Sequence, residues 1–103
     1  MPRLPLGPQA GAGSHVVYLG DDGLLIVEWY DHGPHAPYES ANMLIFDTEQ
    51  QRSLADALKL SAAGRSDADL LAAVQARFQS YFQVQDFCKK NGLKFTKKVD
   101  FWP

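Results

Sequence analysis

The segment from Asp67 to Lys90 constrains the fold most, because apolar side chains recur in it at three- and four-residue steps. This spacing places them on one side of a helix. An apolar stripe left in water loses the burial free energy that stabilises the helix, so the rest of the chain must cover it. Ser66 before the segment and Gly92 after it are residue types that cap helices. The stripe consists of Leu70, Leu71, Val74, Phe78, Tyr81, Phe82 and Gln85.

A single helix over these residues would be about 36 Å long, at 1.5 Å per residue. Three short strands do not easily cover that length. Either a bend near Gln83 would therefore shorten the helix, or a dimer partner would cover the part of it that extends beyond the strands.

Strand patterns precede and follow this helix. Residues 15–19 and 24–30 are apolar runs around Asp22-Gly23, a dipeptide typical of hairpin turns. Residues 41–46 form a third run. Residues 93–102 alternate, which predicts a strand with Leu93, Phe95, Lys97, Val99 and Phe101 on one buried face.

A second helix is expected over residues 48–60. Asp47 and Thr48 are both good caps, and Thr48 with Gln51 fits a capping box. Leu54 and Leu58 lie one turn apart, on the side that should face the core.

These elements predict an α+β domain. The expected antiparallel sheet has about four strands, in the chain order β-β-β-α-α-β, with two helices packed on one face. The length of 103 residues suits one domain. Residues 1–14 hold three prolines and three glycines, so we expect a flexible arm there and a single domain over 15–103.

The cysteine content and hydropathy predict a soluble cytoplasmic protein. Cys88 is the only cysteine, which rules out a disulfide within the chain and fits a reducing compartment. No apolar run approaches the roughly 20 residues of a membrane helix. Cys88 lies at helical spacing from Tyr81 and Val84, so we interpret it as a small core residue rather than a nucleophile.

The charge is divided between the two halves of the chain. Residues 1–50 contain Arg3 and seven acids, a balance of −6, whereas residues 51–103 contain nine basic residues and five acids, a balance of +4. Five of the ten basic residues lie within 89–98. Such asymmetry can steer a charged partner or a second copy of the chain.

The loop between Asp31 and Glu39 is the candidate for chemistry. It brings His32 and His35 together with two carboxylates, and these are suitable ligands for a divalent metal or suitable groups for acid–base catalysis. Pro34 lies between the histidines and prevents a helical arrangement of the pair. The simpler interpretation makes both histidines exposed loop residues, and no cofactor is then expected. No nucleophile motif or phosphate-binding glycine pattern accompanies them.

The lysines of residues 89–98 adjoin Phe95, Phe101 and Trp102, a combination that can bind nucleic acid. Lys89 and Lys90 are also explained as cations at a helix end, and the later lysines as residues of a solvated strand. The acidic total charge further disfavours a nucleic-acid partner.

Docking on protein is the leading hypothesis. Tyr38 in the proline-containing loop and Trp102 near the end of the chain are hard to bury, and such aromatics often anchor interfaces. With Lys94 and Lys98 they form the predicted partner-binding residues. We expect a small non-enzymatic binding or regulatory protein, of the inhibitor or immunity type, that acts as a homodimer, on a foreign protein, or both. The sequence leaves open whether the chain is an enzyme, and favours a non-enzyme.

Overall fold

The computed structural model describes residues 3–7, 13–31, 39–61 and 66–102. An antiparallel sheet and three helices make up this part of the chain, which confirms the α+β class. The sheet has five strands rather than about four, and there are three helices rather than two. In chain order the elements are β1 (Leu4–Pro5), β2 (Gly13–Leu19), β3 (Leu25–Asp31), β4 (Glu39–Phe46), α1 (Thr48–Ala57), α2 (Asp67–Arg77), α3 (Tyr81–Lys90) and β5 (Thr96–Trp102).

The strands lie in the sheet in their chain order, each antiparallel to the next. The turn between β2 and β3 closes as the Asp22-Gly23 pair predicts. Gly23 has φ of +80°, and its backbone N–H donates to the carbonyl of Gly20 at 3.0 Å. The sequence left open the position of the last strand. The structure places β5 beside β4, at the edge of the sheet.

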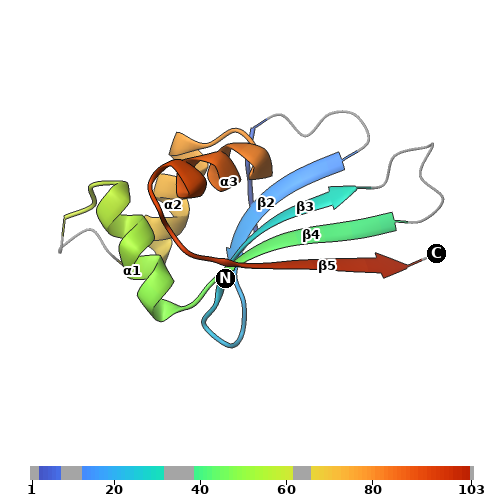
Figure 1. The fold of residues 1–103 in the computed structure, drawn as a ribbon, viewed down its shortest axis with the longest axis horizontal. Helices are drawn as coiled ribbons and strands as arrows, with labels where there is room; N and C mark the ends of the chain where they lie inside the picture. Colours follow the sequence, from blue (N-terminus) through green and yellow to red (C-terminus); the bar gives the residue numbers. More distant parts are fainter. Residues whose placement is uncertain (1–2, 8–12, 32–38, 62–65, 103) are drawn as a thin grey trace.

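The helices pack over one end of the sheet, and the strands run on beyond them (Figure 1). Helix α1 packs on β4, α2 on β1 and β2, and α3 on β3. In the described ranges, none of the helices has the length and apolar character needed to cross a bilayer.

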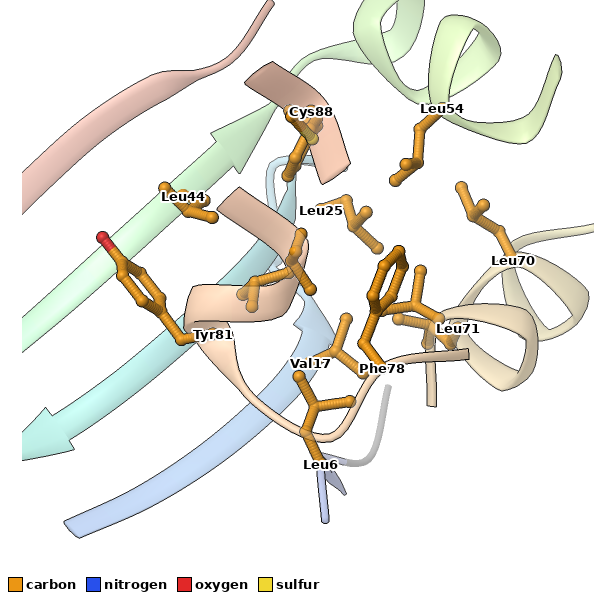
Figure 2. Packing of buried hydrophobic residues seen from close by; sticks show 14 of the residues in the cluster. Leu6, Val17, Leu25, Leu44, Leu54, Leu70, Leu71, Phe78, Tyr81 and Cys88 are labelled. Atoms are coloured by element: carbon orange, nitrogen blue, oxygen red, sulfur yellow. The ribbon is translucent and has the colours of Figure 1, made fainter. Parts of the chain in front are cut away.

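One hydrophobic core fills the space between the helices and this end of the sheet (Figure 2). The alternation of β2, β3 and β4 supplies one layer of it, and the stripes of the helices supply the other. Cys88 belongs to this core, as the sequence predicts. Burial raises the pKa of its thiol to about 11. Core residues with no exposed surface include Leu6, Val17, Leu25, Val27, Leu44, Phe46, Leu54, Val74, Val84 and Cys88.

The prediction of one helix over residues 67–90 is wrong, and the chain breaks at residues 78–80 rather than bending near Gln83. Phe78 takes an extended conformation (φ −121°, ψ 144°) that ends α2, and Ser80 begins α3 by accepting the backbone N–H of Gln83 at 3.2 Å. The interruption allows the Phe78 ring to enter the core, where it is 1% exposed. Two shorter helices thus cover the sheet end that one straight helix would overrun.

The capping box of helix α1 lies one residue earlier than the sequence predicts. The capping box joins Asp47 and Gln50, whose side chains each accept the other's backbone N–H. Gln51 is buried instead, and its Nε2 donates to the carbonyls of Gly23 and Phe46. Gln51 therefore ties α1 to the turn between β2 and β3. Leu54 and Leu58 face the core, as expected.

Within the flexible arm expected over residues 1–14, the described residues 4–6 are anchored to the sheet and the core, and residues 1–2 and 8–12 lie outside the described residues. Strand β1 pairs with β2, and Leu6 is fully buried in the core. The backbone N–H of Leu6 donates to the carbonyl of His15 at 2.8 Å, and Nε2 of Gln75 donates to the carbonyl of Pro5 at 3.2 Å. This anchor could not be predicted from the sequence, because one leucine among glycines and prolines has no periodic pattern.

Candidate docking surface

The outer edge of β5 is open. β5 is the last strand of the sheet, and among the described residues none pairs with its outer side. In an antiparallel edge strand, alternate residues direct their backbone N–H and C=O groups away from the neighbouring strand. β5 therefore presents a row of backbone donors and acceptors that another strand can satisfy.

The two edges of the sheet differ in length and composition. β1 is only two residues long and contains Pro5, which has no N–H to donate. β5 is seven residues long and contains no proline. Short edge strands with proline resist pairing with other chains, whereas a long edge strand invites it. Of the two edges, β5 is the one suited to receive another strand.

The expectation that β5 has one buried face is wrong. Its side chains from Thr96 to Asp100 are all exposed, on both faces. The helices cover the other end of the sheet, and β5 runs away from them (Figure 1). Leu93 and Phe95, which precede the strand, do pack against the core.

Two large apolar side chains are exposed among the described residues, Phe82 at 45% and Val99 at 36%. The strand register places Val99 opposite Asn42, and Asn42 opposite Trp29, so the three lie in one row across the sheet. The Phe82 ring lies edge-on to Trp29, with ring centroids 4.8 Å apart. Opposite residues share a face, and Trp29 packs against the core, so the row lies on the helix side of the sheet. We call the open edge of β5 together with Val99, Trp29 and Phe82 the β5 surface.

His15 supports the far end of this row. It lies opposite Trp29 in the sheet, stacks against its ring, and meets Phe82 edge-on. Its Nδ1 accepts the backbone N–H of Tyr81 at 3.0 Å, at the first turn of α3. Burial lowers the pKa of His15 below 6.5. The sequence placed Phe82 in the apolar stripe that should be covered, and its ring is instead half-exposed. The contact of His15 with α3 was not predicted, because it joins residues 66 positions apart in the chain.

We expect His15 to make the protein less stable in mild acid. The unfolded chain binds the proton near pH 6.5, whereas the folded chain binds it only at lower pH. Its contribution to the free energy of unfolding is therefore complete above pH 6.5 and is lost as the pH falls below that value. Urea unfolding of the wild type and of His15→Asn at pH 7.5 and 5.5 checks this. The Oδ1 atom of asparagine matches the position of Nδ1 and can accept the Tyr81 N–H without titrating, so the variant should lose less stability. An equal loss of unfolding free energy in both proteins would contradict the lowered pKa of His15 as its cause.

Tyr81 lies next to this cluster with its hydroxyl buried and, among the described residues, without a hydrogen-bond partner. A buried hydroxyl without a partner costs about 1–3 kcal/mol in desolvation. We therefore expect Tyr81→Phe to raise the free energy of unfolding by about 1 kcal/mol, measured by urea denaturation. A loss of similar size would instead reveal a hydrogen bond to the hydroxyl.

The described residues among the predicted partner-binding residues do not form one cluster. Lys98 lies in β5, exposed, and forms an ion pair with Asp100 at 3.9 Å. Lys94 precedes β5 and lines a cleft of about 370 Å³ at the start of α1. Trp102 pairs with Glu39 through the backbone at the end of β5, and its side chain lies outside what the structure describes. Tyr38 lies outside the described residues.

The predicted metal site is untested. His32 and His35 lie outside the described residues. Asp31 pairs with Ser40 at the end of β3, and Glu39 is placed only through its backbone. In the described ranges, no group of three or more metal-ligating side chains comes together. The metal site stays a prediction.

The lysines of residues 89–98 do not share one face. Lys97 and Lys98 are neighbours in β5, so their side chains lie on opposite faces of the sheet. Lys89 and Lys90 lie in the last turn of α3. This division gives no support to a continuous basic face for nucleic acid.

Comparisons with protein-family models, with curated proteins and with solved structures found no match to this chain.

Proposed function

We propose that this protein is a small non-enzymatic binding protein that docks on another protein chain through the β5 surface. One observation carries the proposal. In the described part of the chain, two large apolar side chains are exposed on the helix side of the sheet: Val99 on the open edge strand, and Phe82 against Trp29 in the row that starts at Val99.

Neither feature alone would be enough. Single apolar residues on a surface are common, and many edge strands stay unpaired. Together they match the way proteins bind extended segments. The strand edge supplies main-chain hydrogen bonds, and side chains on the sheet face supply apolar contacts. Trp29 below Phe82 adds an aromatic anchor of the kind that dominates interface energies.

Site-specific photo-crosslinking tests the proposal. A benzophenone amino acid replaces Val99 in one variant and Ala72, an exposed residue of α2, in the control. Both are expressed in the source cells and irradiated. We expect a discrete protein adduct from position 99 and none from position 72. An absence of adduct at position 99, or the same adducts at both positions, would overturn the proposal.

A further inference from the structure

We propose that the chain which docks at β5 is a second copy of this protein, with the two β5 strands paired antiparallel about a two-fold axis at Val99. This inference rests on the proposed function and names the partner. The joined sheet would contain both five-stranded sheets, with the two β5 strands side by side at its centre.

The charges of β5 are arranged for this pairing. In the sequence from Thr96 to Trp102, Lys98 and Asp100 lie on either side of Val99. When Val99 lies opposite Val99 of the second copy, Lys98 lies opposite Asp100 of the second copy, and Asp100 opposite its Lys98. Directly opposite residues of unlike charge stabilise an antiparallel pair, and like charges destabilise it. The register thus forms two favourable pairs at once.

Neighbouring registers lack this complementarity. When a two-fold axis perpendicular to the sheet relates the two strands, it passes midway between one residue and the same residue of the second copy. The residue next to the axis therefore sets the register. An axis at Lys98 places two lysines directly opposite each other. An axis at Asp100 does the same with two aspartates. Of the three registers centred on this part of β5, only the one at Val99 avoids like charges and pairs unlike ones.

The exposure of these side chains is consistent with a site that is free in the single chain. The side chains of Lys98 and Asp100 are 58% and 48% exposed, and their contact within one strand is long at 3.9 Å. Lysines on an edge strand normally discourage pairing. In the proposed dimer each Lys98 would lie opposite a carboxylate of the second copy, so the lysine would not prevent pairing in this register.

The row from Val99 to Trp29 also continues across the proposed interface. Val99 lies at the β5 end of the row that runs through Asn42 to Trp29. With Val99 opposite Val99, this row joins its copy on the same face, because a two-fold axis perpendicular to the sheet preserves the faces. The two valines would cover each other's exposed surface. Phe82 lies against Trp29, about two strand spacings or 10 Å from the edge, so strand pairing does not cover it.

Sedimentation velocity over a range of concentrations tests the register through a charge exchange. The proteins are the wild type, Lys98→Asp, Asp100→Lys, and the double variant with both changes. We expect the wild type to reach twice the chain mass of 11.4 kDa. Each single change places like charges in both cross-strand pairs, and should raise the dimer dissociation constant about tenfold or more. The double variant exchanges the charges and restores both pairs, so it should dimerise like the wild type.

A control separates the interface from other effects. Lys59→Asp makes the same charge change at an exposed residue after α1, away from β5. It should leave the dissociation constant unchanged. Far-UV circular dichroism of the single variants checks that they fold, as the exposure of both side chains predicts.

The outcomes distinguish this inference from the proposed function. A wild type that stays monomeric, or a double variant as weak as the single ones, overturns self-pairing. If a crosslink at position 99 then identifies a different protein, docking at β5 stands and the second copy is wrong. If the wild type is monomeric and no adduct forms at position 99, both proposals fail.

Discussion

Replacing Phe78 by alanine is expected to lower the free energy of unfolding by about 3–5 kcal/mol. The ring is 1% exposed and lies edge-on to Phe87, with centroids 5.2 Å apart. It fills the core at the break between α2 and α3, where backbone geometry holds it in place (Figure 2). Truncation would remove the apolar contacts and leave a cavity that neighbouring helices cannot fully close. Urea denaturation measures the loss, and the thermal midpoint should fall by roughly 12 °C or more.

Phe82→Ala is the matched control, because both phenylalanines belong to the apolar stripe of residues 67–90. Phe82 is 45% exposed but contacts other aromatic rings, so its truncation should cost about 1–2 kcal/mol, clearly less than that of Phe78. Similar losses at both positions would contradict the helix break. In one continuous helix, residues four apart lie on the same face, so the two rings would be buried alike.

Replacing Gly7 by alanine is expected to lower the free energy of unfolding by about 3 kcal/mol or more. Gly7 has φ of +65°, where an L-residue is strained by roughly 1–2 kcal/mol. A Cβ there would also overlap the backbone carbonyl oxygen of Gln79. That oxygen belongs to the link between α2 and α3 and cannot rotate away as a side chain can. The N-terminal segment would have to shift, which would draw Leu6 from the core at a cost approaching that of a buried leucine, about 2–5 kcal/mol.

Gly92→Ala separates these two contributions. Gly92 has nearly the same φ, +67°, but nothing lies within 4 Å of its would-be Cβ. This variant should lose only the strain, roughly 1–2 kcal/mol. Both variants are compared by urea denaturation at one protein concentration. Equal losses would show that the N-terminal segment does not pack against the link between α2 and α3.

Local patterns predicted most of the elements correctly. The apolar runs of residues 15–19 and 24–30, the turn at Asp22-Gly23 and the cap at Ser66 depend on neighbours in sequence. Each lies within two residues of where it was expected. The break at Phe78 was missed because both new helices keep the same apolar spacing. Only the position of the sheet decides that the Phe78 ring must turn inward.

The β5 surface was harder to predict, because its residues too are placed by the sheet rather than by their neighbours in sequence. Lys98 was identified as a partner residue from charge and strand pattern, and it lies on the exposed edge strand. Val99 was predicted to be buried, because alternation shows which residues share a face but not whether a helix covers it. The row from Val99 to Trp29 depends on β5 pairing with β4, which the sequence did not decide.

Amide hydrogen exchange of β5, followed residue by residue by NMR at low and high protein concentration, tests the central claim most directly. Alternate residues of Thr96–Trp102 direct their N–H groups outward from the edge. If β5 pairs with a second copy, this outward set should exchange quickly in dilute protein and become protected as the concentration rises. Outward amides that exchange equally fast at every concentration would contradict the account.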